Sequence, residues 1–283
     1  MDFLLIIFFV SGFILKQIYK NHGHVKTSIN NYMLYFGLPL LIFVSLVNSS
    51  YINIGKIISI TVIYNIFSIL IFFILIRYLK IENKTKATIF LCSAFGNFAY
   101  LGIPYCFYFF GKEGAAIAAL FSIITAIFHF SLGISVSRSY LNEKSTSLKE
   151  MINPVSVGLI VAFIMSRFIF HVPLSIEKFA GFGTYLILFV IGLSVNLEKP
   201  DKNYIIGFLG RFVVSPILMI AILILTGFSS YFFIFLLLSL MPPAFTNTVL
   251  SIKYDFDKEY ASKFTSMSTI MMVLVFGVLS IFI

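Results

Sequence analysis

Short polar stretches divide the sequence into ten apolar runs, numbered below in chain order as spans one to ten. The runs are Phe3–Leu15, Tyr32–Val47, Ile57–Ile76, Ala87–Phe110, Ala115–Val136, Val155–Phe170, Phe179–Val195, Tyr204–Leu225, Tyr231–Ile252 and Phe264–Ile283. A helix needs about 20 residues to cross the hydrocarbon core, so the shorter runs must extend into their flanks. Lipid offers the backbone no hydrogen bonds, and the strict alternation of a membrane barrel is absent. We therefore expect an all-α integral membrane protein with about ten transmembrane helices.

The composition agrees with this expectation, because 60% of the residues are hydrophobic and only 11% are charged. Soluble domains average about 45–50% apolar and about 25% charged residues. Too little polar surface remains to coat a water-soluble globule, so the lipid bilayer is an expected partner. A net charge of +9 could suggest nucleic acid, but the basic residues lie in short loops and form no basic stripe. We expect no nucleic-acid partner.

Lysine and arginine are distributed unevenly between the loops, which predicts the orientation of the chain. Fifteen of the 20 lie in alternate loops, four lie in the intervening loops, and Arg211 lies within span eight. Loops rich in positive charge stay on the cytoplasmic side. We therefore expect a multi-pass protein of the plasma membrane with both termini on the outer side. The fifteen are Lys16, Lys20, Lys26, Arg77, Lys80, Lys84, Lys86, Arg138, Lys144, Lys149, Lys199, Lys202, Lys253, Lys258 and Lys263.

A polar loop in the middle of the chain, Ser139–Asn153, separates five spans from five spans. An odd number of spans in the first half makes the second half enter the membrane from the opposite side. This is the topology of an inverted repeat, a common construction of secondary transporters. We therefore predict a first repeat at residues 1–138, a cytoplasmic linker at 139–153 and a second repeat at 154–283. The halves do not align residue by residue, so the repeat is inferred from topology.

The fourth span of each half contains helix-breaking residues near its middle. Span four carries Gly96, Gly102 and Pro104, and span nine carries Pro242 and Pro243. Prolines remove amide donors and free the carbonyls of the preceding turn. Glycine and proline also serve ordinary packing in membrane helices, but the matched depth favours two broken helices that cross. The helix N-termini at such a crossing would present positive partial charge to an anion.

Several polar residues lie near that depth. Asn97 is expected to contact substrate, whereas Thr246 and Asn247 either contact substrate or bridge helices. Arg211 either extends its charge towards the cytoplasmic side or acts as a counter-charge for an anionic substrate. His129, in the middle of span five, is interpreted as a packing residue rather than a proton carrier.

The groups that the spans lack also narrow the function. No Asp or Glu lies deep in a span, whereas proton pumps and sodium/proton exchangers usually need buried carboxylates. This disfavours a cation exchanger and leaves a neutral-to-positive cavity that suits an anion. Cys92 and Cys106 are too far apart along a helix for a disulfide. No zinc spacing or nucleotide-binding loop is present, so neither a metal nor a cofactor is expected.

Seven fragments in order resemble the auxin efflux carrier family, which comprises PIN-like transporters and their prokaryotic relatives. The resemblance covers essentially the whole chain. The fragments are YFGLPLLIF with Pro39, GNFAYLGIP with Asn97 and Pro104, FFGKEG, NPVSVGLI, FVIGLSV, RFVVSP and MPPAFTNTVLSIKY. Plant members carry a proline just before the span-four asparagine, where this chain has Gly96, and they commonly have a longer central loop. The substrate therefore need not be auxin.

The resemblance implies a ten-helix inverted-repeat fold like that of sodium/proton antiporters or bile-acid transporters. Spans one, two, six and seven would form a scaffold, and spans three to five and eight to ten would form a transport domain that moves like an elevator. Asn97 would be the crossover asparagine and Pro242 the crossover proline, with the substrate site beside them. A homodimer is implied by the resemblance alone. Prokaryotic relatives are linked to malonate, malate and related carboxylates.

These observations together predict a secondary transporter for small organic anions. The expected substrates are carboxylates, either auxin-like or malate- and malonate-like. The alternative is an anion channel or passive pore, which would show flux without saturation or counterflow. A membrane-embedded enzyme would need paired polar groups at a helix end. The sequence contains no such pair beyond scattered loop charges, so no enzymatic activity is expected.

Overall fold

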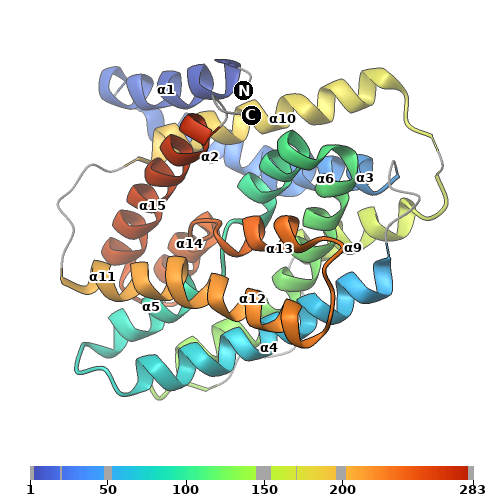
Figure 1. Ribbon diagram of the computed structural model, residues 1–283. Coiled ribbons are helices and arrows are strands. Elements are labelled where there is room, and N and C mark those ends of the chain that lie inside the picture. The colour runs from blue at the N-terminus through green and yellow to red at the C-terminus, as the bar shows by residue number, and fades with distance from the viewer. Residues whose placement is uncertain are drawn as a thin grey trace.

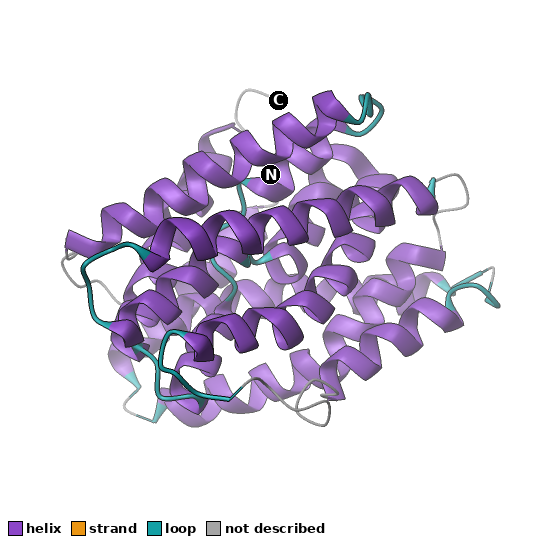
Figure 2. Ribbon diagram, turned by 90° about the horizontal axis from the view of Figure 1, so that it is seen from below, coloured by secondary structure: helices purple, strands orange, loops and turns teal. Residues whose placement is uncertain are grey.

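The computed structural model describes residues 3–19, 21–47, 53–144, 154–169, 171–195 and 202–279, which form helices joined by loops (Figures 1 and 2). The helices are α1 (Phe3–Ile18), α2 (His22–Tyr32), η1 (Met33–Gly37), α3 (Leu38–Val47), α4 (Ile54–Arg77), α5 (Asn83–Ala94), η2 (Phe98–Gly102), α6 (Ile103–Phe128), η3 (His129–Gly133), α7 (Ile134–Ser139), α9 (Pro154–Met165), α10 (Leu174–Ser194), α11 (Lys202–Leu209), η4 (Gly210–Val214), α12 (Ser215–Leu225), α13 (Phe232–Ser239), α14 (Phe245–Lys253) and α15 (Lys258–Leu279). The elements labelled η are π-helical turns. The ten apolar runs are mainly helical within the described residues, which confirms the all-α prediction.

Five helical segments are long and apolar enough to cross a membrane: His22–Val47, Ile54–Arg77, Phe98–Ser139, Leu174–Ser194 and Lys202–Leu225. The longest has 42 residues and breaks at Gly111, whose φ of 64° and ψ of −156° are not helical. Glycine adopts this left-handed conformation without strain, so it separates predicted spans four and five. The count of ten spans and the 5+5 repeat stay predictions. Residues 145–153 of the predicted linker, Phe170 and residues 280–283 lie outside the described residues.

Helices α1 and α10 lie against each other at an unusually short distance (Figure 1). A Cβ atom on Gly12 would collide with the carbonyl oxygen of Phe189, and one on Gly192 would collide with the carbonyl oxygen of Phe9. Each glycine therefore faces the backbone of the opposite helix. Small residues at such contacts let membrane helices pack through their backbones, which gives van der Waals attraction where no hydrophobic effect operates.

Replacing Gly192 with alanine is expected to destabilise the protein by about 1–3 kcal/mol, the usual cost of overpacking. The new methyl group meets backbone rather than a flexible side chain, so α1 must move away from α10. Gly181→Ala, in the same helix, is the matched control because nothing lies within 4 Å of its added Cβ. Thermal unfolding of the purified protein in detergent measures both. An equal melting temperature for the two variants would contradict the close contact.

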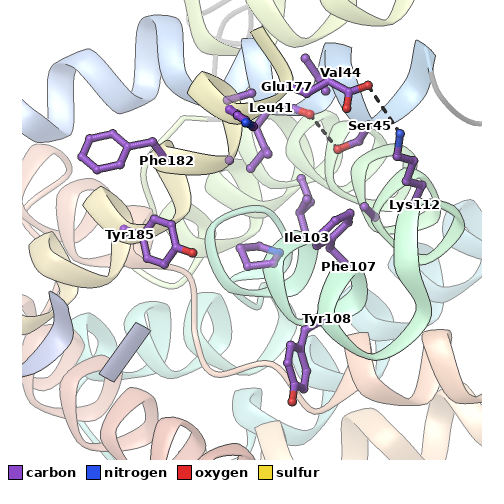
Figure 3. Close-up of a pocket in the computed structure, with 15 residues that line it drawn as sticks. Leu41, Val44, Ser45, Ile103, Phe107, Tyr108, Lys112, Glu177, Phe182 and Tyr185 are labelled. Carbon is purple, nitrogen blue, oxygen red and sulfur yellow. Dashed lines mark hydrogen bonds and ion pairs between the residues drawn. The ribbon is translucent and has the colours of Figure 1, made fainter. Parts of the chain in front are cut away.

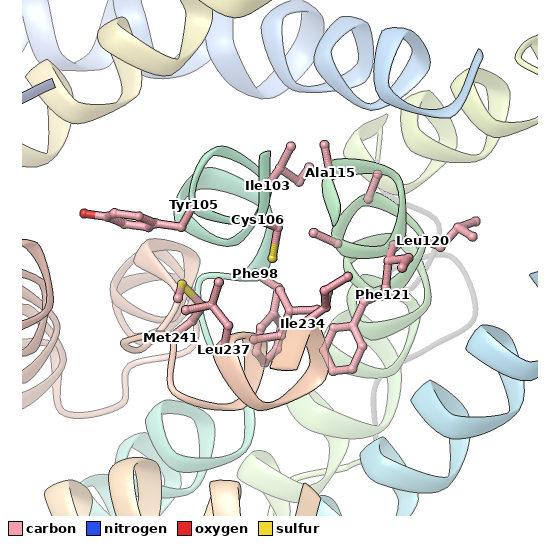
Figure 4. Packing of buried hydrophobic residues seen from close by; sticks show 14 of the residues in the cluster. Phe98, Ile103, Tyr105, Cys106, Ala115, Leu120, Phe121, Ile234, Leu237 and Met241 are labelled. Carbon is pink, nitrogen blue, oxygen red and sulfur yellow. The ribbon is translucent and has the colours of Figure 1, made fainter. Parts of the chain in front are cut away.

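The core packs around the two halves of α6. The rings of Phe98 and Phe121 lie 4.8 Å apart edge to face, and Phe121 also meets Phe235 of α13 at 6.0 Å. Figure 4 shows Phe98 and Phe121 in this cluster, with Ile234 close to them. Small buried residues on α6 allow this close packing, namely Ala115, Ala116, Ala118 and Ala119. Phe98 follows the segment after α5, and Phe235 precedes the segment after α13. Their packing on α6 therefore positions both segments.

Candidate functional site: a crossing of two broken helices

The two predicted interruptions are present, and they lie against each other. Between α5 and η2, and between α13 and α14, the chain leaves the helical conformation, and Gly96 and Pro243 pair as an antiparallel bridge. The amide of Asn97 donates to the carbonyl of Pro242 at 2.7 Å, and the amide of Ala244 donates to the carbonyl of Phe95 at 3.0 Å. The breaks thus satisfy each other's backbone groups, which buried irregular backbone requires. The predicted crossing of broken helices is confirmed in this respect.

The residue types at the crossing explain why it forms there. Pro242 and Pro243 have no amide hydrogen, so the helix that ends before them cannot continue its hydrogen-bond ladder. A Cβ on Gly96 would lie 2.7 Å from Nη2 of Arg211 and 2.8 Å from the ring of Phe98. Glycine at position 96 therefore makes room for the arginine.

Arg211 connects the ends of both broken helices. Its side chain is 0% exposed, so the interpretation that it extends its charge to the cytoplasmic surface is wrong. Nε donates to the carbonyl of Met241 at 2.6 Å and Nη2 to that of Ser239 at 2.9 Å. Nη1 donates to the carbonyl of Ser93 at 3.1 Å and lies 3.5 Å from Oγ of Ser215. The carbonyls belong to the C-terminal ends of α5 and α13.

This arrangement places one fixed positive charge between two helix C-termini. Each C-terminus carries about half a negative elementary charge, so one guanidinium offsets both. The role of Arg211 as a counter-charge for a substrate stays a prediction. Its four hydrogen bonds show that it links the two broken helices.

The two helix N-termini at the crossing differ in whether a side chain caps them. Asn97 precedes η2, and its side-chain oxygen accepts a hydrogen bond from the amide of Tyr100 at 3.2 Å. Ala244 precedes α14 and has no side chain that could cap it. The first amides of a helix have no partner within the helix. The start of α14, at Phe245 and Thr246, therefore offers amide donors and positive partial charge.

A cavity of about 70 Å³, here called the crossover cavity, lies beside these N-termini. Its lining includes Gly96, Asn97, Tyr100, Ser122, Thr125, His129, Phe245 and Thr246. Two polar atoms of this lining, the hydroxyl of Tyr100 and Nε2 of His129, have no hydrogen-bond partner among the described residues. Their residues are only 8% and 4% exposed. An unpaired buried polar group is costly, so both atoms are candidates for contacts with a bound ligand.

Each of the four π-helical turns contains a residue that lines a cavity beside Asn97 or binds the backbone of the crossing. Met33 lies in η1, Tyr100 in η2, His129 in η3 and Arg211 in η4. A π-helical turn contains an additional residue and redirects the side chains around it, and such turns are frequent at functional sites. The four occur in different helices, so the redirected side chains converge only in the folded chain.

The structure brings some of the predicted site residues together and separates others. Gly96, Asn97 and Thr246 line the crossover cavity. Asn247 is not part of this lining, and its Nδ2 donates to the carbonyls of Leu91 at 3.2 Å and Phe95 at 3.0 Å, so it bridges helices.

Two further predicted residues lie away from the crossover cavity. Gly102 packs against Leu238, where a Cβ would approach to 2.9 Å. Pro104 lines a different cavity. Neither residue contributes to the lining beside Asn97.

Sequence reasoning missed Tyr100 and interpreted His129 as a packing residue. The packing is real, because the rings of His129 and Phe95 stack at 4.3 Å. However, Ser122, Thr125 and His129 recur at intervals of three and four residues, which places three polar groups on one face of an apolar helix. That stripe is the signal that could have identified this side of the cavity.

A larger cavity of about 600 Å³ lies between α3, α6 and α10 (Figure 3). Its lining is mainly apolar, and an ion pair between Lys112 and Glu177 at 3.5 Å connects α6 to α10 beside it. A narrow crevice, which shares Asn97, Tyr100 and Phe245 with the crossover cavity, is further lined by Asn30, Met33, Ile187, Val190 and Ile191. Within the described residues, no three His, Cys, Asp or Glu side chains gather in a way that could hold a metal ion.

Comparison with known proteins places the chain in a family. The family model described as "Membrane transport protein" matches residues 3–143 and 137–280. An uncharacterized transporter from Methanothermobacter thermautotrophicus is 25% identical over 275 residues, which cover 92% of this chain and 90% of that protein. The chain therefore belongs to the membrane transport protein family that includes the auxin efflux carriers.

Proposed function

We propose that the protein is a secondary transporter that moves small organic anions, carboxylates by class, across the plasma membrane. This proposal depends on one observation: at the crossing, the helix C-termini have a positively charged partner, whereas one helix N-terminus has no cap. Arg211 neutralises the two C-terminal ends, whereas the uncapped start of α14 faces the crossover cavity. The cavity is therefore left with positive partial charge, which attracts an anion.

The polar atoms of the cavity suit a carboxylate. The hydroxyl of Tyr100 and Nε2 of His129 can each donate a hydrogen bond, and neither has a partner in the part of the chain that the structure describes. The amides at the start of α14 supply further donors. A carboxylate accepts several hydrogen bonds at its two oxygens. Auxin-like and malate- or malonate-like carboxylates are the substrates to test.

An elevator-type alternating-access mechanism is supported by where the cavities lie. The large cavity separates α3 and α10, which belong to the predicted scaffold, from α6, which belongs to the predicted transport domain. The crevice likewise separates η1 and α10 from the crossing. Loosely packed surfaces between the two sets of helices would let one set slide against the other with the substrate bound at the crossing.

The proposal is tested with protein purified in detergent and exposed to acetate, malonate, malate and indole-3-acetate as potassium salts. The corresponding neutral amides are the matched controls. We expect at least one anion, and no amide, to raise the melting temperature. In proteoliposomes the same anion should show saturable uptake and counterflow. Linear uptake without counterflow would identify a passive pore instead.

Replacing His129 with phenylalanine is expected to weaken anion binding about tenfold, because a hydrogen bond to a charged group contributes about 1.5–3 kcal/mol. Phenylalanine preserves the stacking on Phe95 and removes an unpaired buried nitrogen. The ligand-free variant should therefore be at least as stable as the wild type. His171→Phe is the control, because His171 is exposed and distant in sequence from the cavity. Unchanged affinity in His129→Phe would leave His129 as a packing residue only.

A further inference from the structure

A lysine lies beside the crossing, and no carboxylate among the described residues forms an ion pair with it. The ammonium of Lys26, in α2, lies 5.0 Å from the centre of the Phe245 ring. Phe245 is the first residue of α14 and lines both the crossover cavity and the crevice. The side chain of Lys26 is half-buried, and the three ion pairs formed within the described residues do not include it.

The spacing along α2 directs Lys26 towards the crossing. Asn30 and Met33 follow it by four and seven residues and line the crevice beside Asn97 and Tyr100. Residues at these intervals share one face of a helix. Lys26 therefore lies one helical turn, about 5–6 Å, beyond the lining residues along the same face.

The neighbouring cations are engaged elsewhere. Lys16 donates to the carbonyl of Val195, at the C-terminal end of α10. Arg211 is held by the C-terminal ends of α5 and α13. The ammonium of Lys26, by contrast, lies over an aromatic face, a contact that contributes about 0.5–2 kcal/mol and that a carboxylate can replace.

We propose that Lys26 selects anions at the entrance to the crossover cavity. A carboxylate approaching along the crevice binds the ammonium, and the ammonium then leaves the ring of Phe245. The ring belongs to the residue that begins α14, so release of this contact uncovers the N-terminus where the anion is bound. The contact joins α2 of the predicted scaffold to α14 of the predicted transport domain. This inference rests on the proposed function.

The test compares the wild type with Lys26→Gln and Lys26→Arg. Each is titrated with acetate, malonate, malate and indole-3-acetate, and the melting temperature is recorded. We expect Lys26→Gln to bind the stabilising anion about 10- to 100-fold more weakly, the range for a lost charge-assisted hydrogen bond. Lys26→Arg should retain most of the affinity. Added potassium chloride should weaken binding to the wild type and to Lys26→Arg more than binding to Lys26→Gln, because screening acts on the charge.

The controls separate this inference from the proposed function. Lys80→Gln removes an exposed charge on the same predicted side of the membrane and should bind like the wild type. If Lys26→Gln binds anions as tightly as the wild type does, the role of Lys26 is refuted while the transporter proposal stands. If no anion stabilises the wild type or any variant, both proposals fail. Equal loss in Lys26→Gln and Lys26→Arg would also refute selection by charge.

Discussion

Replacing Arg211 with methionine is expected to reduce the free energy of unfolding by several kcal/mol, enough to leave little folded protein. Three buried carbonyls, those of Ser93, Ser239 and Met241, would lose their donor. Each unsatisfied buried group costs about 1–3 kcal/mol. Two helix C-termini would also face each other without a positive charge between them. A domain with about 5–15 kcal/mol of total stability tolerates such a loss poorly.

Arg211→Lys distinguishes charge from geometry. Lysine keeps the charge but lacks the planar guanidinium, so it cannot reach carbonyls on two helices at once. We expect an intermediate melting temperature. Arg167→Met is the control, because Arg167 is exposed and, among the described residues, its guanidinium donates to one carbonyl, that of Leu46. The measurement is thermal unfolding followed by size-exclusion chromatography. A stable Arg211→Met protein that no longer binds anions would instead make Arg211 the counter-charge of the substrate.

The helices and their interruptions could be predicted because their causes are local. A long apolar run forms a helix in lipid whatever its neighbours are. Likewise, Pro242 and Pro243 cannot continue a hydrogen-bond ladder in any context. The depth of both breaks followed from counting residues along the runs. Their meeting then followed from the matched depth, and the Gly96–Pro243 bridge confirms it.

The partners of the polar side chains could not be predicted in the same way. Arg211 binds the carbonyl of a residue 118 positions away in the sequence. Its side chain projects from a π-helical turn that no residue pattern predicted. Lys26 was counted only as one of the lysines that orient the chain. Its place over Phe245 exists because α2 and α14 meet in the folded protein. Long-range packing decides such contacts.

Replacing Asn97 with aspartate is expected to weaken anion binding at least about 100-fold while the fold is preserved. The side-chain oxygen of Asn97 accepts from the amide of Tyr100, and aspartate keeps this cap because it is an equally good acceptor. It also adds a negative charge to the cavity lining, and like charges in contact cost several kcal/mol. The nearby helix N-terminus favours the ionised form. Equilibrium binding of the anion that stabilises the wild type measures the effect.

Asn97→Ala provides the contrast that makes the interpretation specific. Alanine removes the cap, so the variant should lose about 1 kcal/mol of stability, whereas Asn97→Asp keeps the cap. Both should lose affinity, but alanine less, because it removes a contact without adding repulsion. Asn83→Asp controls for the added charge, because Asn83 is exposed at the first residue of α5. If Asn97→Asp binds the anion as the wild type does, no anion sits beside the crossing, and the uncapped start of α14 has no ligand there.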